Sequence, residues 1–220
     1  MKDMESGLQY TLGNIDVKQN RMDFFVGKNY APGGYLWIFP KGDGLANVGI
    51  GISGTYSKTK SARKYLDEFV DEHFPNAAKL TTVCGGIPCD KPLKNPVKSG
   101  LFLVGDAAHH VNPVTGGGIS SGMTAGWIGG QVAADLIRKN TLDEKSLQAY
   151  TDWVFKEFGK NYSRVYNIKN AISQLTDDDL DKIAVKIKNT PKEKRTLNKI
   201  FSKALINKPR LLLDVIKVFA

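Results

Sequence analysis

The sequence predicts a mixed fold of the α+β or α/β class, with a strand-rich first half, one buried strand, a glycine-rich loop and terminal helices. Three observations predict it. The pair Asp43-Gly44 lies between two apolar runs, which is typical of a β-hairpin. The continuous apolar run 101–104 is typical of a buried strand, often a parallel one. Beyond residue 119 the pattern is that of helices.

The first region, residues 1–98, is expected to form part of an antiparallel, substrate-binding sheet with one helix. Its predicted strands span 8–17, 21–27, 35–40, 45–52 and 83–88. The helix is predicted over 58–73, where Leu66, Phe69 and Val70 follow helical spacing and Pro75 follows the end.

Two further regions complete the predicted organisation. Residues 99–140 are expected to contain the closing strand, the glycine-rich loop and a helix from 119 to about 139. Residues 141–220 are expected to form a helical region. Its predicted helices span 142–166, 178–188, 192–206 and 210–219.

Composition limits the class of protein. The chain has 220 residues, of which 41% are hydrophobic, enough to fill a core. No run approaches the length of a membrane span, and no apolar segment of a signal peptide follows Met1. Two cysteines, Cys84 and Cys89, offer no disulfide framework. We therefore expect a cytoplasmic protein.

The net charge of +9 is uneven, because residues 151–220 hold 15 Lys/Arg against 8 Asp/Glu. Such an excess suits solvated helix faces, nucleic acid, anionic lipid or an acidic partner. The sequence lacks zinc-finger spacing, an aromatic RNA-binding motif and a basic heptad region, so nucleic acid is not an expected partner. An anionic membrane surface is kept as a partner, because the segment 210–219 is amphipathic and basic.

Gly116-Gly117-Gly118 precedes the helix predicted from Ile119. Successive glycines let the backbone approach a ligand closely, and the first amides of a helix have no intrahelical partner. Together with the helix dipole they form a site for a negative or electron-rich group. Asp106, directly after the apolar run, could accept hydrogen bonds from a sugar or ribitol hydroxyl, or could simply cap a turn.

This loop matches neither common phosphate-binding motif. Ser121 takes the place of the third glycine of G-x-G-x-x-G, and no Lys-Ser/Thr pair follows as in a P-loop. Within the helix, Gly122, Gly126, Gly129 and Ala133 share one stripe. Because glycine costs a helix about 1 kcal/mol relative to alanine, the stripe indicates close packing against another element.

Alternation along the strand 35–40 places Tyr35, Trp37 and Phe39 on one face. With an even-length turn, Ala46, Val48 and Ile50 are expected on this aromatic face. The glycines Gly49 and Gly51 are then expected on the opposite face. The aromatic face is compatible with ordinary sheet core or with the wall of a ligand cavity.

The remaining polar residues do not predict a metal site. Cys84 and Cys89 have a spacing that fits a zinc hook poorly, and His109 and His110 are adjacent instead of one helical turn apart. A general acid or other catalytic residue cannot be assigned from the sequence.

Two motifs now carry a resemblance. The segment from Leu101 to Ile119, with Gly105-Asp106-Ala107-Ala108 and Gly116-Gly117-Gly118, resembles the second FAD motif of flavin hydroxylase-like proteins. Pro32-Gly33-Gly34-Tyr35-Leu36-Trp37-Ile38-Phe39-Pro40 resembles the Y-x-W-x-F-P motif of the geranylgeranyl reductase family. The two motifs together favour that family and its archaeal lipid reductases, over about residues 8–140.

The resemblance implies a role for each matching residue. Asp106 would hold the ribitol chain of FAD, beside Gly105 and Ala107. Backbone N–H groups of Gly116, Gly117, Gly118 and Ile119 would face the flavin pyrimidine ring. Pro113 would lie against the isoalloxazine. The segment Tyr35, Trp37, Phe39 and Pro40 would line a cavity for a polyprenyl lipid, with Tyr35 and Trp37 as polar tips.

The family begins with a βαβ unit carrying G-x-G-x-x-G, and no such segment occurs in this sequence. The resemblance therefore implies the C-terminal part of an FAD-dependent flavin hydroxylase-like fold, with an incomplete FAD site in this chain alone. An N-terminal half or a companion chain would be its partner.

The implied activity is saturation of isoprenoid double bonds in archaeal ether lipids, at the membrane surface or in the cytoplasm. A related monooxygenase or halogenase, and an inactive fragment that binds lipid or a partner, are the alternatives.

Overall fold

The structure is a computed structural model that describes residues 3–196. The chain folds into two compact units. The first runs to Ile87 and includes Thr176–Leu180, and the second runs from Pro88 to Leu175 and resumes at Asp181. The helix expected over 210–219 and most of the one expected over 192–206 lie outside the described residues. Each unit is described by itself below.

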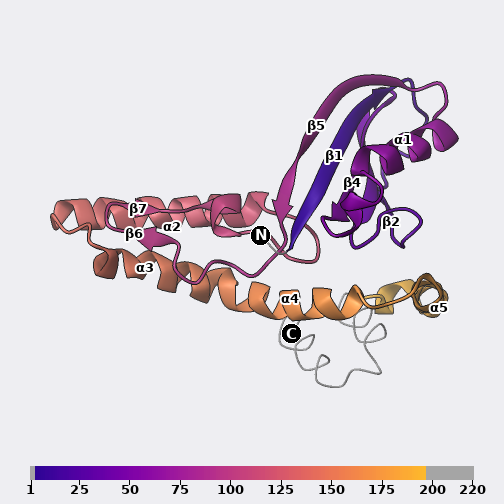
Figure 1. Ribbon diagram of the computed structural model, residues 1–220. Helices are drawn as coiled ribbons and strands as arrows, with labels where there is room; N and C mark the ends of the chain where they lie inside the picture. Colours follow the sequence, from indigo (N-terminus) through magenta and orange to yellow (C-terminus); the bar gives the residue numbers. More distant parts are fainter. Residues whose placement is uncertain (1–2, 197–220) are drawn as a thin grey trace. The chain divides into compact units, whose positions relative to one another are not determined.

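The first unit is a five-stranded sheet with the order β2-β3-β4-β1-β5. Its strands are β1 (Met4–Gly13), β2 (Asp23–Phe25), β3 (Tyr35–Gly42), β4 (Leu45–Ser53) and β5 (Ala78–Pro88). The pairs β1–β4, β2–β3 and β3–β4 are antiparallel, as expected for this region. A single-turn 3-10 helix, η1 (Tyr56–Lys58), and helix α1 (Ala62–His73) complete the unit (Figure 1).

The predicted hairpin is confirmed, whereas several other boundaries differ. β1 begins before residue 8 and ends at Gly13, because Asn14 takes a left-handed conformation with φ of 57°. The strand expected over 83–88 begins at Ala78, in an exposed stretch that lacks apolar alternation. The helix expected from residue 58 begins at Ala62, where the Ser61 hydroxyl accepts a hydrogen bond from the Lys64 N–H at 3.2 Å.

The pairing of β3 with β4 corrects the expected faces of this hairpin. Gly42 pairs with Leu45, but the register shifts between Pro40 and Gly42, so that Trp37 lies opposite Gly49 and Ile38 opposite Val48. The aromatic face therefore carries the glycines, and Val48 and Ile50 lie on the other face. The expectation was wrong because it assumed a regular turn, and one extra residue moves every side chain to the opposite face.

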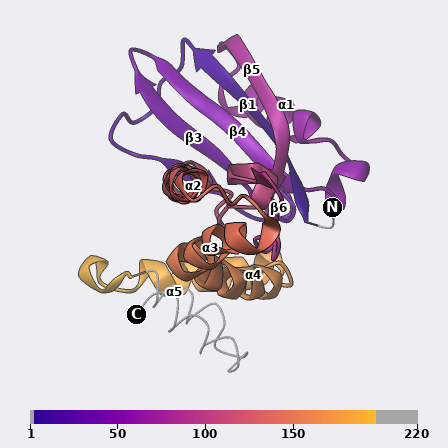
Figure 2. The same ribbon diagram turned by 90° about the vertical axis from the view of Figure 1, so that its left-hand side faces the viewer.

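The core of the first unit lies on the face opposite the aromatic residues. Helix α1 covers this face through Leu66, Phe69 and Val70, and Figures 1 and 2 show it lying against the sheet. The strands contribute fully or almost fully buried side chains from three neighbours. These are Leu8, Tyr10, Leu12, Leu36, Ile38, Ala46, Val48 and Ile50. Burial of this apolar surface holds α1 and the sheet together.

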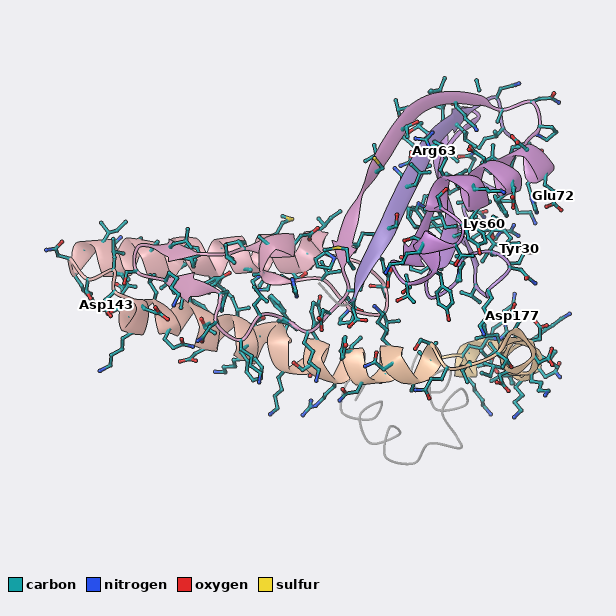
Figure 3. The ribbon with its side chains drawn as sticks, in the orientation of Figure 1. Tyr30, Lys60, Arg63, Glu72, Asp143 and Asp177 are labelled. Carbon is teal, nitrogen blue, oxygen red and sulfur yellow. The ribbon has the colours of Figure 1, made fainter. Side chains whose placement is uncertain are left out.

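The start of helix α5 (Asp177–Lys188) belongs to the first unit. Oδ1 of Asp177, labelled in Figure 3, accepts a hydrogen bond of 2.9 Å from the Lys28 N–H. Thr176 caps the helix, because its hydroxyl accepts a hydrogen bond of 3.2 Å from the Asp179 N–H. Asp177 therefore anchors the loop after β2, at Gly27, which has a φ of 116°.

The second unit combines a short hairpin with helices. The strands are β6 (Val97–Lys98) and β7 (Leu101–Phe102), followed by the 3-10 turn η2 (Gly105–Ala108). The helices are α2 (Ile119–Arg138), α3 (Glu144–Val154), the π-helical η3 (Phe155–Gly159), α4 (Lys160–Ile172), α5 and the 3-10 turn η4 (Lys192–Lys194). Asp143, labelled in Figure 3, caps α3 by accepting a hydrogen bond of 2.9 Å from the Ser146 N–H.

The run 101–104 was expected to form a buried strand of a kind that is often parallel. Within the described residues it does not form such a strand. β7 contains only Leu101–Phe102 and pairs antiparallel with β6. The side chain of Leu101 is 52% exposed. An apolar run is buried on both faces only where other strands and helices cover it, and β6 is the one strand that pairs with it in the described part of the chain.

The predicted close packing of the glycine stripe of α2 is confirmed at Gly129 only, because Gly122 and Gly126 would accept a Cβ atom in ordinary contact and Gly126 is exposed. A Cβ atom on Gly129 would lie 2.5 Å from the Phe102 ring, and one on Gly122 would lie 3.7 Å from Cα of Gly105. Helix α3 lies beside α2 and buries Leu147 and Tyr150 in the same core. The Tyr150 hydroxyl donates a hydrogen bond of 2.8 Å to the Leu103 carbonyl. The β6–β7 hairpin, α2 and α3 thus share one hydrophobic core.

The single helix expected over 142–166 is three consecutive segments, because η3 interrupts it between α3 and α4. A π-helical turn adds a residue to the helix and re-aims the side chains around it. No helix among residues 3–196 is long and apolar enough to cross a membrane.

The close fit of Trp37 over Gly49 yields a stability prediction. A Cβ atom on Gly49 would lie 2.3 Å from Cζ2 of Trp37, whereas one on Gly85 would meet nothing within 4 Å. We expect Gly49→Ala to lower the free energy of unfolding by about 1–3 kcal/mol, because the indole must move. Gly85→Ala, the matched control on β5, should change it by less than about 0.5 kcal/mol. Urea unfolding measures both, and equal effects would contradict the register.

Candidate functional site

The loop between η2 and α2 brings together the predicted cofactor residues of the second unit. Gly105 begins η2 with a φ of 64°, which favours glycine, and His109 ends it in a left-handed conformation. The exposed Asp106 lies beside Gly118, because a Cβ on Gly118 would be 3.1 Å from Asp106 Oδ1. The carboxylate and the N-terminus of α2 are therefore neighbours, and glycine leaves the space between them open.

Asn112 holds this loop in shape. Its side-chain Oδ1 accepts hydrogen bonds from the Val114 N–H at 3.0 Å and the Thr115 N–H at 3.2 Å. Its backbone N–H donates to the Gly117 carbonyl, and its carbonyl accepts from the Gly116 N–H, each at 2.9 Å. The loop is thus rigid before any ligand arrives, which lowers the entropy cost of binding.

The loop itself uses two of the four amides expected to face a flavin. The Gly116 N–H donates to Asn112, and the Gly117 N–H donates to the Thr115 hydroxyl at 3.2 Å. Within the described residues, the N–H groups of Gly118 and Ile119 have no such partner, and no side chain caps α2. These two amides are the ones placed to receive a negative group.

The other predicted residues of the loop differ in exposure. Ala107 is exposed, and the side chain of Ile119 is 83% exposed. Pro113 is buried, which leaves little of its ring surface for a ligand. Among the described residues, no group of acidic, histidine or cysteine side chains could hold a metal ion.

His110, adjacent to this loop, is buried and neutral. Its Nδ1 accepts a hydrogen bond of 3.2 Å from the Gly105 N–H, so the neutral ring carries its proton on Nε2. The ring packs against Phe158 and Tyr150. Burial, with a smaller contribution from the charge of His109, lowers the pKa of His110 to about 4. The side chain therefore braces Gly105 without charge at neutral pH.

The aromatic wall of the first unit comprises Phe24, Tyr35, Trp37 and Phe39. Ring centroids of Tyr35 and Trp37 lie 5.6 Å apart, and those of Trp37 and Phe39 lie 5.9 Å apart in a stacked arrangement. Phe24 contacts both Tyr35 and Phe39 at 5.6 Å. Tyr35, Trp37 and Phe39 are half-buried, and so is Pro40, whereas Leu36 and Ile38 on the opposite face of β3 are buried. The face of β3 that carries the aromatic rings is therefore less buried than the face that α1 covers.

Polar groups also lie on this open face. The Trp37 Nε1–H donates a hydrogen bond of 3.1 Å to the Gln9 side chain, and the Thr11 hydroxyl donates to the Asn47 side chain at 2.9 Å. The indole N–H, which was expected to orient a ligand as a polar tip, therefore donates its hydrogen bond to Gln9. Sequence reasoning missed Phe24 and Gln9, since only the pairing of β2 and β1 with their neighbours brings them to Trp37.

Comparison with known proteins identifies the family. A model of the geranylgeranyl reductase catalytic domain matches residues 3–87, which include the aromatic wall. Residues 3–87 belong to the geranylgeranyl reductase family. This match covers the first unit up to the end of its sheet.

Relatives extend over nearly the whole chain. The digeranylgeranylglycerophospholipid reductase of Methanocella arvoryzae is 38% identical over 216 residues, which cover 98% of this chain and 55% of the relative. Digeranylgeranylglycerophospholipid reductase 1 of Methanococcoides burtonii is 39% identical, and the match covers 88% of this chain and 48% of the relative. The chain thus spans about half the length of these reductases.

Solved structures support the same assignment. A geranylgeranyl bacteriochlorophyll reductase-like protein from Thermoplasma acidophilum matches with a TM-score of 0.87 and 31% identity, over 99% of this chain and 55% of that protein. A halogenase solved with FAD matches with a TM-score of 0.59 at 13% identity, over all of this chain and 48% of that one. The second match shows a shared fold only.

The depressed pKa of His110 predicts a pH dependence of stability. The unfolded chain binds a proton near pH 6.5 and the folded chain only near pH 4, so this contribution to stability is present above pH 6.5 and falls as the pH drops toward 4. When the pH is lowered from 7 to 5, we expect the free energy of unfolding of His110→Gln to fall by about 1 kcal/mol less than that of the native protein, after allowing for solvent screening. Urea unfolding at both pH values measures this, and parallel losses would contradict it.

Proposed function

We propose that this chain is the C-terminal portion of an FAD-dependent reductase that saturates isoprenoid double bonds of archaeal membrane ether lipids. The observation that carries the proposal is the open aromatic wall at the family's own motif, Tyr35 to Pro40. The relatives are named as reductases of a digeranylgeranyl phospholipid, which is a substrate of that chemistry. A wall of aromatic rings above two glycines offers the flat, apolar surface that a polyprenyl chain needs.

The residues of the loop fit a flavin. Gly118 and Ile119 offer amide donors at the start of a long helix, where the dipole favours negative charge. Asp106, an exposed carboxylate next to Gly118, can accept hydrogen bonds from the ribitol hydroxyls. When bound, reduced FAD would supply the hydride that adds to one alkene carbon, while a proton would add to the other carbon.

The chain's own residues would then orient the substrate and exclude water. Trp37, held by Gln9 and seated on Gly49, gives the prenyl chain a fixed surface. Phe24, Tyr35 and Phe39 extend that surface on both sides of the indole. A fixed surface aligns a double bond for transfer at a small entropy cost.

The partner that this proposal requires is the other half of the family's fold, as an N-terminal portion or a companion chain. One face of α2 is apolar and exposed along its length, at spacings of three and four residues. It comprises Ile119, Met123, Trp127, Gly130, Ala134 and Ile137, of which Ile119 is 83% and Met123 72% exposed. A continuous apolar face of this kind marks an interaction surface.

Two alternatives are distinguished by the same features. A flavin-dependent monooxygenase or halogenase shares the fold, but the matched halogenase is only 13% identical to this chain. An inactive fragment that binds lipid or a partner would keep the wall and lose the flavin. Product analysis with and without oxygen separates a reductase from a monooxygenase.

Association with anionic membrane surfaces, from a cytoplasmic location, fits the excess of basic residues.

The role of Asp106 can be tested by flavin retention. We expect the purified chain, combined with the other half of the fold and then desalted, to retain FAD, as read from its visible absorption spectrum. Asp106→Asn should weaken FAD binding about tenfold, because it replaces a charged acceptor. Asp135→Asn, on an exposed part of α2, is the matched control. Equal retention by both variants would remove Asp106 from the site.

The exposed face of α2 predicts how the two halves associate. Met123→Glu should weaken association with the other half about 100-fold, because it would bury a carboxylate in an apolar contact. Gln131→Glu introduces the same charge at an exposed position outside the face and should have little effect. Isothermal titration calorimetry measures both. An unchanged affinity for the Met123 variant would show that the face is not the contact.

A further inference from the structure

Strand β5 forms one edge of the sheet in the first unit and is exposed along nearly its whole length. It spans 11 residues, and within the described residues β1 is the one strand beside it. Figures 1 and 2 show it at the side of the sheet, next to β1. All but its last two residues are exposed, so both of its faces are open to solvent. Its outer row of backbone N–H and C=O groups faces no other strand in the described part of the chain.

The features that usually prevent an edge strand from pairing do not occur in the middle of β5. The stretch 80–88 contains no charged residue, and its one proline, Pro88, is the last residue of the strand. The charge of Lys79 is used within the unit. Its ammonium lies 2.6 Å from Oδ1 of Asp67 in α1 and 4.8 Å from the centre of the Tyr10 ring. This lysine therefore holds β5 to its own unit and does not protect the outer edge.

The opposite edge of the same sheet is protected. It is formed by β2, which is only 3 residues long. Arg21, just before this strand, forms an ion pair of 2.6 Å with Asp23 in it. Short strands and charged side chains are common means of keeping a sheet edge from pairing. The contrast between the two edges indicates that β5 is the one that can take a further strand.

The residues of β5 also favour a partner that covers its faces. Thr81, Thr82 and Val83 are β-branched and favour extended backbone. The side chains of Leu80 and Val83 are 55% and 62% exposed. A Cβ atom on Gly85 would meet nothing within 4 Å. The strand thus offers apolar side chains and open space as well as its backbone edge.

The size of the contact favours one occupant over another. A second copy of this chain, paired through the two β5 edges, would leave both faces of the strand exposed. Such a contact gives little of the roughly 1,200–2,000 Å² that stable interfaces bury. The reductase of Methanocella arvoryzae, in contrast, is matched over only 55% of its length. The remaining part of such a protein is long enough to supply a strand together with elements that cover its faces.

We propose that an extended segment from the other half of the reductase fold adds to β5 as a further strand of this sheet. Its backbone groups pair with the outer row of β5, and its uncharged side chains lie beside Leu80 and Val83. This inference rests on the proposed function, which requires the other half as a partner. The contact belongs to the first unit, whereas α2 belongs to the second, so the two surfaces can be tested separately.

The two cysteines give a chemical measure of whether β5 is covered. Cys84 lies in the exposed stretch, whereas Cys89 is fully buried. N-ethylmaleimide should therefore modify Cys84 in the purified chain, as read by mass spectrometry of its peptides. We then co-express the chain with the part of the Methanocella arvoryzae reductase that it does not match. In that complex the modification should be about tenfold slower or more, because a covered thiol reacts only when the contact opens.

The opposite results of this experiment are equally clear. An unchanged rate of Cys84 modification in the complex would overturn the proposal, and so would failure of the two proteins to associate. Sedimentation of the purified chain tests the second-copy alternative. A stable dimer that protects Cys84 without the other half would show that another copy occupies the edge, and this would also overturn the proposal.

Hydrogen exchange distinguishes an added strand from coverage of the faces alone. A new ladder bonds one row of amides, which belongs to alternate residues of an antiparallel strand. We therefore expect amides of β5 that exchange rapidly in the purified chain to gain protection in the complex. Slower modification of Cys84 without any newly protected amide in β5 would show coverage without strand pairing and would overturn the proposal.

A matched pair of valines tests the position of the contact. Val83→Lys places a charge on the edge strand and should weaken association with the other half about tenfold. Val185→Lys makes the same change in α5, where the side chain is 57% exposed against 62% for Val83, and should have little effect. Both sites are exposed, so both variants should fold, as checked by circular dichroism. Equal weakening by the two variants would contradict a contact at β5.

Retention of FAD separates this inference from the proposed function. If the complex protects β5 but neither retains FAD nor reduces a digeranylgeranyl lipid, strand addition is supported and the proposed reductase activity is wrong. If the complex retains FAD and reduces the lipid while Cys84 and the β5 amides stay as reactive as in the purified chain, the proposed function is supported and strand addition is overturned.

Discussion

The register shift between Pro40 and Gly42 determines what the first unit can do. A regular two-residue turn would pair residues so that Val48 and Ile50 shared a face with Trp37. The shift instead places Gly49 opposite Trp37 and Gly51 opposite Tyr35. Small residues beneath the rings let the indole lie flat on the sheet, where a Cβ atom would collide with it. The same shift sends the branched side chains of β4 to the face that α1 covers.

The second unit reaches its loop geometry by local means. The side chain of Asn112 accepts hydrogen bonds from the backbone of its own loop, and His110 Nδ1 accepts one from the Gly105 N–H. The absence of a side chain at Gly118 leaves room for the carboxylate of Asp106. None of these contacts requires a bound cofactor. The amides left over at the start of α2 are therefore preorganised, and preorganised donors are worth more than donors that must first be arranged.

Much of this was predictable from local patterns, and the rest depended on pairing. Asp43-Gly44 predicted the hairpin, and the glycine stripe of α2 predicted close packing, which the structure shows at Gly129 against Phe102. The face of Gly49 was not predictable, because a bulge leaves no clear mark in apolar alternation. The sequence also did not predict that β7 is short and pairs antiparallel with β6. An apolar run indicates that side chains are buried, but it does not show which strand is the hydrogen-bonded neighbour.

The most direct test of the account is proton NMR of Trp37 and Gly49. The structure places the α-proton of Gly49 that faces the indole against the ring, so it should show a strong upfield ring-current shift and a nuclear Overhauser effect to the Trp37 ring protons. An Overhauser effect from the Trp37 ring to the methyl groups of Val48 instead would place the aromatic residues in the core. That result would contradict the open wall on which the proposed function depends.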